Sequence, residues 1–214
     1  MLLNKIVSHG LCFCISLIMQ AELQRFEKTL LSNTHAFEVE LTPDDVERLR
    51  TYYSLLTRWN DRLHLVAPCS PEEFATRHVL ESLVLLKHLP HGAKIADIGS
   101  GAGLPLVPCL IVRPDLEVTL IEASRKKAVF LREAISAVGR TATIIARRFE
   151  DIEAPQVEFV TSRALDQFIR KIPVLLKWAP KGSTLLLFGG EQLLNAERFL
   201  IPGSEKRYLF LTRI

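Results

Sequence analysis

The stretch "KIADIGSGAGLPLVP", Lys94–Pro108, holds three glycines at alternate positions, Gly99, Gly101 and Gly103. A short apolar run precedes them, which predicts a buried strand, and a helix-like apolar run follows. Glycine permits a positive φ and lets another molecule approach the backbone without meeting a Cβ atom. The stretch therefore predicts a strand-to-helix turn against which a ligand lies.

Short apolar runs and helix-like runs alternate after residue 93. We expect strands in "EVTLIEA", "TATIIA", "QVEFVTSRA", "STLLLFG" and "KRYLFLTRI", and helices in "SRKKAVFLREAISAVG" and "DQFIRKIPVLLKWAP", where Pro173 predicts a kink. Near-continuous apolar strands that alternate with helices are typical of a parallel sheet covered on both faces. The pattern predicts a doubly wound, mostly parallel α/β domain over residues 93–214.

Two helices are predicted before this sheet, and each begins with capping residues. Thr42 precedes Pro43 and two aspartates, which suits a helix N-terminus. Ser70 precedes a proline in the same way, and Glu73 is placed to complete a capping box. We therefore expect residues 20–92 to form an N-terminal helical cap on the sheet.

The first nineteen residues contain the apolar stretch "LCFCISLIM", Leu11–Met19. It is too short to span a bilayer, which takes about 20 residues, and no small-residue cleavage site follows it. We expect residues 1–19 to be a poorly ordered or helical extension, with Met19 as an alternative start to Met1. No membrane association is predicted.

The composition is that of an ordinary globular protein, with 48% hydrophobic and 24% charged residues in a chain of 214. The formal charge of +3 permits contact with a polyanion without requiring it. The four cysteines form no C-x-x-C pair and no His/Cys ligand set. We therefore predict no metal site, and a reducing cytoplasmic location.

The spacing of the glycines separates two classes of cofactor. Dinucleotide-binding folds use G-x-G-x-x-G, but Leu104 stands where that pattern needs its third glycine. The pattern D-x-G-x-G-x-G instead resembles the first motif of the S-adenosylmethionine-dependent methyltransferases. Glu122 ends the next predicted strand, where a carboxylate can accept hydrogen bonds from a ribose diol.

A third feature follows the next strand, where Phe149 and Glu150 offer an apolar surface and an acceptor for an adenine. Taken singly, these features could be a tight turn, a charge at a helix N-terminus and plain surface. Their order at successive strand ends predicts a site for S-adenosylmethionine.

The order of longer segments extends this prediction. "LLTRWNDRLHLV", "PEEFATRHVLESLVLL", "DIGSGAGLPLVPCLIVRP", "TLIEASRKKAVFLREA", "RRFED" and "VTSRAL" resemble the 16S ribosomal RNA guanine-N7 methyltransferase family, first called glucose-inhibited division protein B. The resemblance covers roughly residues 42–190. It implies a Rossmann-like class I fold and methyl transfer from S-adenosylmethionine to N7 of guanine 527 in 16S ribosomal RNA. It also implies a cytoplasmic protein whose substrate is the small-subunit particle or an assembly intermediate.

The resemblance also implies the site residues. Those on the substrate side would be Asn60, Arg77, His78 and Arg163. The cofactor contacts would be Gly99, Gly101, Gly103, Leu104, Glu122, Ala123, Ser124, Phe149, Glu150 and Arg163. The chain departs from the family at Glu81, where an aspartate is usual, and at Gly189, where a lysine is frequent.

Several roles stay open at this point. Arg163 could hold the cofactor carboxylate or the edge of guanine, or form a salt bridge to Asp97 or Asp166. His78 could be a core histidine or a substrate contact. Candidate cations for RNA are Arg125, Lys126, Lys127, Arg147, Arg148, Arg170, Lys171 and Lys177.

The chemistry predicted for N7 needs no general base, because this nitrogen already carries an in-plane lone pair. No acid, base or cysteine nucleophile is therefore assigned, and positioning is expected to accelerate the reaction. The alternative activities are methylation of another RNA, a protein or a small molecule. A nicotinamide dehydrogenase and a non-catalytic cofactor-binding module are more remote alternatives.

Overall fold

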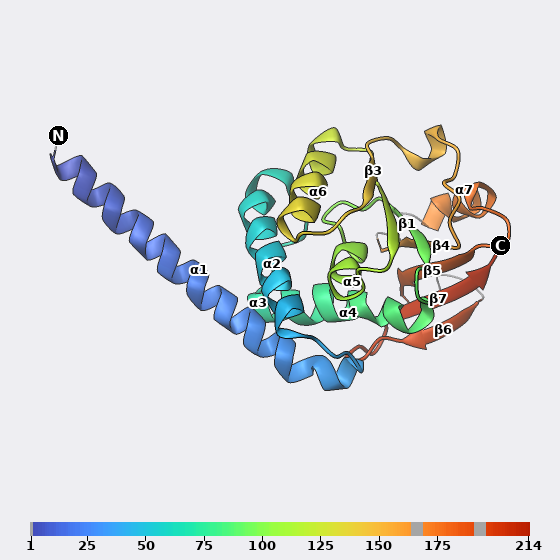
Figure 1. The fold of residues 1–214 in the computed structure, drawn as a ribbon, viewed down its shortest axis with the longest axis horizontal. Coiled ribbons are helices and arrows are strands. Elements are labelled where there is room, and N and C mark those ends of the chain that lie inside the picture. Colours follow the sequence, from blue (N-terminus) through green and yellow to red (C-terminus); the bar gives the residue numbers. More distant parts are fainter. Residues whose placement is uncertain (1, 164–168, 191–195) are drawn as a thin grey trace.

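A seven-stranded sheet forms the centre of the computed structural model, which describes residues 2–163, 169–190 and 196–214 (Figure 1). The strand order is β3-β2-β1-β4-β5-β7-β6. Strands β1 to β5 run parallel, and β7 lies antiparallel between β5 and β6. The prediction of a doubly wound, mostly parallel sheet is confirmed. The strands are β1 Lys94–Ile98, β2 Glu117–Ile121, β3 Thr143–Ile145, β4 Phe159–Ser162, β5 Thr184–Gly189, β6 Glu197–Leu200 and β7 Tyr208–Arg213.

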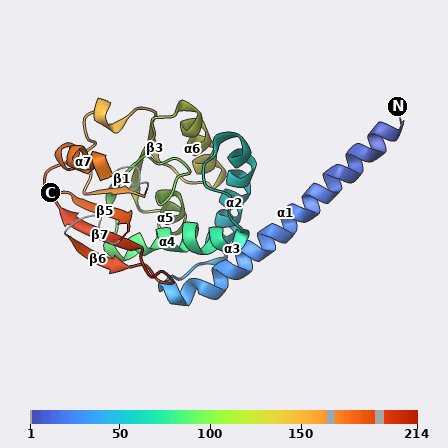
Figure 2. The same cartoon turned by 180° about the vertical axis from the view of Figure 1, so that it is seen from behind.

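Helices cover both faces of this sheet. The cap, α5 and α6 pack against one face of the sheet. Helix α7 packs against the other face, at the end of the molecule away from α2 (Figure 2). Pro173 lies in the first turn of α7, directly after the helical run changes from 3₁₀ (η5) to α winding at Ile172. The helices are α1 Leu2–Phe37, α2 Pro43–Leu63, α3 Pro71–Glu73, η1 Phe74–Leu80, α4 Glu81–Leu83, η2 Val84–His88, α5 Leu106–Val112, α6 Arg125–Ala137, η3 Phe149–Asp151, η5 Ile169–Lys171 and α7 Ile172–Trp178.

The strands are apolar on both faces because each face meets a different core. Ile95 and Leu186 join the larger core beneath the cap, α5 and α6. Ala96 and Leu185, their neighbours in sequence, join the smaller core that contains Leu175 of α7. Successive side chains of a strand point to opposite faces, so two covered faces require an unbroken apolar run.

The predicted caps of the N-terminal helices differ in completeness. At α2, Thr42 Oγ1 accepts from the Asp45 amide at 3.2 Å and the Asp45 carboxylate accepts from the Thr42 amide at 2.9 Å. At α3, Ser70 Oγ accepts from the Glu73 amide at 3.1 Å. The Glu73 carboxylate, however, binds the Arg77 guanidinium at 2.7 Å. The capping box predicted at Ser70 is therefore only half formed.

The second predicted helix is one continuous helical stretch whose winding changes along its length. It begins as α3, widens into a π-helix at η1, returns to α at α4 and ends as the 3₁₀-helix η2. Within η1, the Glu81 amide donates to the carbonyl of Thr76, five residues earlier. Such π-turns are rare and are frequent at functional sites.

The first helix runs straight through the predicted boundary at residue 19. Its N-terminal part projects from the rest of the molecule, whereas Phe26 and Leu30 are fully buried against the cap (Figure 1). Phe26 stacks on Tyr53 of α2, with the ring centroids 4.7 Å apart. In the described part of the chain, no helix has the length and apolarity to cross a membrane.

Gly103, in the turn after β1, is tightly packed, and it gives a stability prediction. Its φ is +87°, and a Cβ atom there would lie 2.4 Å from Val107 Cγ2 and 3.2 Å from Leu131 Cδ2. Gly182 has a similar φ of +83° with nothing within 4 Å of such an atom. We expect Gly182→Ala to cost about 1–2 kcal/mol through backbone strain alone. Gly103→Ala should cost about 1–3 kcal/mol more, because overpacking is added. Urea denaturation of both variants measures the difference, and equal costs would contradict the close packing of this turn.

Candidate functional site

The turn that follows β1 places three glycines in the left-handed region, with φ values of +71°, +49° and +87° at Gly99, Gly101 and Gly103. Its amides are used within the protein. The Gly99 and Ser100 amides donate to the carbonyl of Ile121 at 2.9 and 3.2 Å. The turn therefore offers a ligand an open backbone to lie against, and not a row of free amides.

Glu122 connects this turn to the next strand. Its Oε2 accepts from the Gly101 amide at 2.8 Å, and its Oε1 accepts from the Ser124 amide at 2.7 Å. The side chain is buried, with the residue only 8% exposed. Each carboxylate oxygen keeps a further acceptor position. The two amides therefore fix the orientation of the carboxylate without using up its capacity to bind a ligand.

A cavity of about 440 Å³ lies over the carboxyl ends of β1, β2 and β3. Five predicted cofactor residues meet in its wall: Gly99, Glu122, Ala123, Phe149 and Glu150. Open parallel sheets bind their ligands at this edge, where the strand order reverses. The remaining lining residues are Ile98, Ile121, Lys127, Arg147, Arg148 and Lys171.

The aromatic and acidic residues of η3 complete one end of this cavity. Phe149 is buried, and its ring meets Trp178 of α7 nearly edge-on at 5.5 Å. Glu150 binds Lys171 at 2.6 Å and Arg148 at 3.4 Å. Burial alone would raise the pKa of Glu150, but the bonds from Lys171 and Arg148 hold this pKa below its usual value. Glu150 is therefore an ionised acceptor at neutral pH.

Four other predicted cofactor residues do not line the cavity but lie next to residues that do. Gly101 and Ser124 hold the Glu122 carboxylate through their amides. Gly103 and Leu104 are buried in the turn. These four residues shape the cavity from outside it.

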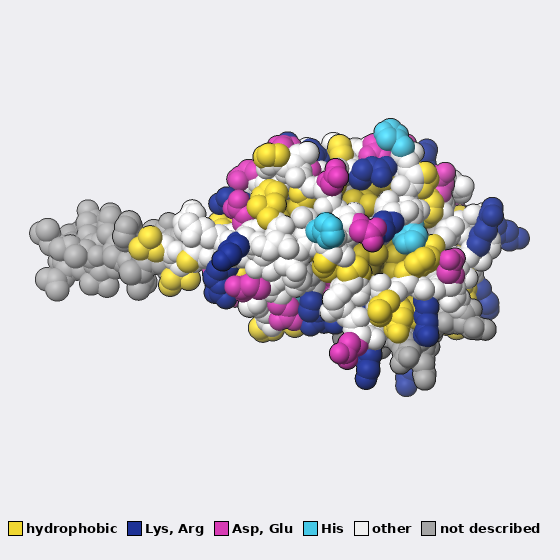
Figure 3. Space-filling view, turned by 90° about the horizontal axis from the view of Figure 1, so that it is seen from below, with side chains coloured by type: hydrophobic (Ala, Val, Ile, Leu, Met, Phe, Trp, Pro, Cys, Tyr) yellow, Lys and Arg dark blue, Asp and Glu magenta, His cyan; other side chains and the backbone are white. Residues whose placement is uncertain are grey.

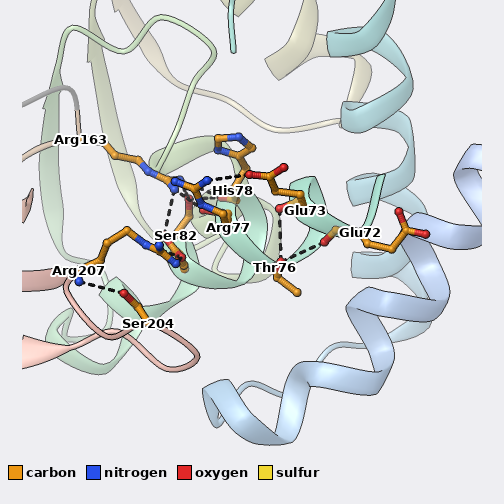
Figure 4. A network of polar contacts seen from close by, with 10 residues as sticks. Glu72, Glu73, Thr76, Arg77, His78, Ser82, Arg163, Ser204 and Arg207 are labelled. Carbon is orange, nitrogen blue, oxygen red and sulfur yellow. Dashed lines mark hydrogen bonds and ion pairs between the residues drawn. The ribbon is translucent and has the colours of Figure 1, made fainter. Parts of the chain in front are cut away.

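Arg163 follows β4, and its guanidinium binds residues of the cap (Figure 4). Arg163 is not among the described residues that line the cavity. It donates to the carbonyl of His78 and to Ser82 Oγ, both at 3.2 Å, and also to the carbonyl of Arg77. Its ion-pair partner is Glu81, at 3.2 Å. The salt bridge that we considered to Asp97 is therefore wrong, and Asp166 lies outside the described residues.

Glu81 is shared by a second arginine, which sequence reasoning missed. Arg207, from the connection between β6 and β7, donates to Glu81 Oε1 at 3.1 and 2.6 Å. The Glu81 side chain is only 3% exposed, while those of Arg163 and Arg207 are 19% and 38% exposed. One buried carboxylate thus holds two guanidiniums, and it joins the cap, β4 and the C-terminal hairpin. The one signal for this in the sequence was an acid within the apolar run "VLESLVLL".

The three cap residues predicted on the substrate side occupy different places. Asn60 Oδ1 accepts from the Val66 amide at 2.9 Å and so braces the end of α2. Arg77 is about half exposed and paired with Glu73. His78 packs on Phe74, with the ring centroids 5.2 Å apart. None of these three residues is among the described residues that line the cavity.

The ionisation of His78 follows from its surroundings. Burial, together with the nearby positive charges of Arg163 and Arg77, lowers the pKa of His78 to about 3. Its Nδ1 is buried and has no hydrogen-bond partner in the part of the chain that the structure describes. The imidazole is therefore neutral at neutral pH.

Asp97, at the end of β1, is a buried acid without a partner. Its residue exposure is 0%, and neither carboxylate oxygen has a hydrogen-bond partner within the described ranges. Burial raises the pKa of Asp97 to about 8, and the negative charge of Glu122 acts in the same direction. The sequence motif contained this residue, but its isolation appears only in three dimensions.

Comparison with known proteins assigns this arrangement to a family. The family model described as rRNA small subunit methyltransferase G matches residues 45–211. The chain belongs to this family. As a member it is a methyltransferase, and the family's cofactor is S-adenosylmethionine.

Three relatives in the family carry the name ribosomal RNA small subunit methyltransferase G. The one from Xanthomonas campestris is 41% identical over 155 residues, which are 70% of this chain and 71% of the relative. The one from Halorhodospira halophila is 35% identical over 167 residues, with coverage of 78% and 79%. The one from Chromobacterium violaceum is 38% identical over 138 residues, with coverage of 62% and 66%.

Solved structures of lower identity share the fold. MtNAS in complex with MTA and tNA has a TM-score of 0.54 at 14% identity, and the match covers 94% of this chain and 73% of that one. A mutant of MtNAS in complex with S-adenosylmethionine has a TM-score of 0.51 at 13% identity, with coverage of 94% and 75%. These likenesses show a shared fold over most of this chain.

The residues at the cavity of this methyltransferase fit its cofactor. Glu122 offers acceptor positions and Phe149 an apolar ring. Asp97 does not line the cavity, but a cationic ligand near the end of β1 would favour the ionised form of its buried carboxyl group. No cluster of three potential metal ligands occurs among the described His, Cys, Asp and Glu residues.

The shared carboxylate of Glu81 predicts a large effect on stability. Glu81→Gln leaves two guanidiniums without a counter-charge in a largely buried place, which should cost about 3–5 kcal/mol of unfolding free energy. Glu117→Gln is the matched control, because Glu117 makes a surface pair with Lys94 and its side chain is 65% exposed. The control should cost less than about 1 kcal/mol. Arg207→Met in the Glu81→Gln background should recover part of the loss, because it removes one uncompensated charge. Chemical denaturation measures all four proteins, and equal costs for the two Gln variants would contradict the interpretation.

Proposed function

We propose that this methyltransferase transfers the methyl group of S-adenosylmethionine to N7 of guanine 527 in 16S ribosomal RNA. One observation carries the proposal: residues at the ends of β1, β2 and β3 form one cavity, in a chain whose relatives are named for the small-subunit ribosomal RNA. The family resemblance of the signature segments supplies the position in the RNA. The proposed location is the cytoplasm, and the proposed substrate is the small-subunit particle or an assembly intermediate.

The cavity residues divide the recognition of the cofactor between them. Glu122 would accept hydrogen bonds from the ribose diol, and Phe149 would lie against the adenine, with Glu150 as an acceptor for its amino group. Gly99 lets the ligand lie against the backbone, since no Cβ stands there. The cofactor, when bound, supplies an electrophilic methyl group on a positively charged sulfur.

In the proposed reaction the protein has to position the reactants and stabilise charge, because N7 of guanine already has an available lone pair and needs no general base. His78, on the cap side of the site, is a poor proton acceptor, because its pKa is held near 3. Cys109 is unsuited as a nucleophile, because it is fully buried and burial raises the pKa of its thiol. Holding N7 in line with the methyl group can lower the barrier by about 7–11 kcal/mol.

The distribution of charge favours approach of RNA at the carboxyl edge of the sheet. Lys127, Arg147 and Arg148 stand at the rim of the cavity. By contrast, acidic and basic side chains are interspersed on the face seen from below (Figure 3). A polyanion is attracted to the first arrangement more than to the second.

The proposed reaction is tested on small-subunit particles from a strain that lacks the gene. We expect one labelled methyl group per particle, and we expect it at guanine 527 when the RNA is mapped by cleavage chemistry specific for N7-methylguanine. Particles from the parent strain, already modified, are the control and should take up no label. Label at another nucleotide, or only in protein, would refute the proposed substrate.

Glu122 gives a prediction for cofactor affinity. Glu122→Gln keeps the size of the side chain but replaces one acceptor oxygen with an amide donor, which then faces a backbone amide. We expect the dissociation constant for S-adenosylmethionine to rise about tenfold or more, since a bond to a charged group is worth about 1.5–3 kcal/mol. Glu133→Gln, on the exposed surface of α6, is the control and should leave the constant unchanged. Calorimetric titration decides, and an unchanged affinity in Glu122→Gln would remove this residue from the site.

Asp97 predicts a pH dependence of the same affinity. Below its pKa of about 8 the free protein holds a proton on Asp97, and a cationic cofactor nearby favours the ionised form. Binding should therefore release a proton, and affinity should rise with pH between about 6 and 7.5, by at most about tenfold per unit. His78 does not interfere, because it titrates near 3. Asp97→Asn should bind more weakly and lose the dependence, and a variant that keeps the slope would assign it to another group.

A further inference from the structure

A second hollow, of about 340 Å³, lies between the last turn of α2 and the first turns of α6. Its lining residues are Trp59, Arg62, Leu63, Lys126 and Val129, and we call it the Trp59 hollow. Lys126 is followed in sequence by Lys127, which lines the cofactor cavity. The two concave sites therefore adjoin across the first turn of α6.

The floor of the Trp59 hollow is apolar surface that the protein does not cover. The Trp59 ring is partly buried and meets Phe130 edge-on, with the centroids 6.1 Å apart. Val129 beside it is 49% exposed, which is unusual for a large aliphatic side chain on a packed helix. Bases of unpaired nucleic acid stack on aromatic surfaces of this kind, because every base has a π-face.

The rim of the Trp59 hollow carries positive charge that is not neutralised. Arg62 and Lys126 are exposed, and neither forms an ion pair with an acidic residue of the described chain. Several other cations of the cap are paired, namely Arg25 with Glu72, Arg77 with Glu73, and Lys87 with Glu38. Two cations without an ion pair therefore lie beside the apolar floor, and an anion with an aromatic part matches this combination.

We infer that the Trp59 hollow binds an unpaired nucleotide of the RNA substrate, with its base against Trp59 and its phosphates at Arg62 and Lys126. This inference rests on the proposed function for the choice of RNA as ligand. The hollow would be a second RNA-binding site outside the cofactor cavity, for a nucleotide that flanks the methylated guanine. A single-stranded nucleotide is required, because a base within a duplex presents no free face.

Fluorescence of Trp59 tests the stacking directly. The chain has two tryptophans, so in a Trp178→Phe background Trp59 is the sole emitter. We expect single-stranded oligoadenylate to quench this emission, and a duplex RNA of equal length to do so only at a concentration about tenfold higher or more. Trp59→Leu should weaken binding of the oligoadenylate about tenfold or more, as measured by anisotropy of a labelled strand. Unchanged emission with saturating oligoadenylate would overturn the inference.

The contribution of the two rim cations is tested with two matched pairs of substitutions. Arg62→Ser with Lys126→Ser removes two cations from the rim. Arg132→Ser with Lys181→Ser removes two exposed cations, one on α6 and one in the turn before β5. The slope of log affinity for oligoadenylate against log salt should shrink by about 1.4 in the first pair only, since each phosphate contact on a single strand contributes roughly 0.7. Equal changes in the two pairs would refute a specific role for the rim.

The outcomes separate this inference from the proposed function. Methylation of guanine 527 by a protein whose Trp59 never responds to RNA would overturn the Trp59 hollow as a nucleotide site and leave the proposed reaction intact. Quenching by oligoadenylate in a protein that methylates no ribosomal RNA would support the hollow and refute the proposed reaction. Emission that changes with protein concentration in the absence of RNA would place a second copy of the chain in the hollow and overturn the inference.

Discussion

The carboxylate of Glu122 is the contact on which the rest of the cofactor site depends. It is bound by the Gly101 amide at 2.8 Å and by the Ser124 amide at 2.7 Å, so it joins the turn after β1 to the start of α6. The positive φ of Gly101 is what aims its amide at this oxygen, and a Cβ atom on Gly101 would lie 4.0 Å from it. A buried carboxylate needs such donors, because an unpaired charge in this position is costly. The same bonds that satisfy Glu122 therefore hold the wall of the cavity in place before any ligand arrives.

The sheet and the meeting of the strand ends at one cavity could be predicted from the sequence, because both depend on local patterns. Each strand is a short apolar run, and the two cores on either side of Ile95 and Ala96 explain why the run is unbroken. The predicted helix "SRKKAVFLREAISAVG" begins where expected, and Ser124 caps it by accepting from the Lys127 amide at 3.4 Å. Once the strands are parallel and adjacent, their carboxyl ends meet at one edge, so Gly99, Glu122 and Phe149 converge without further information.

The cap side of the site could not be predicted, because its contacts join residues far apart in sequence. Arg163 and Glu81 are separated by 82 positions, and Arg207 and Glu81 by 126. No periodicity or spacing reports such a pair, and the salt bridges considered for Arg163 were drawn from nearer acids. Arg77 and the helix N-terminus also compete for the Glu73 carboxylate. Arg77 binds it, so the predicted capping box does not form in full. The π-helical turn of η1 follows no sequence signal that we recognise, and its Arg77 and His78 carbonyls are bound by the same Arg163.

The contacts of Arg163 bear on how the two halves of the molecule act together. Its donors bind the cap at His78, Ser82 and Glu81, while its backbone continues β4 beside β1 of the cofactor turn. Any movement of the cap relative to the sheet must therefore break several charge-assisted bonds in a largely buried place, which is expensive. The cap and the carboxyl edge of the sheet thus form one rigid frame around the site. For the proposed reaction, which needs no proton transfer before attack, a rigid frame would be the contribution that matters most, because the rate depends on how well the two reacting atoms are held in line.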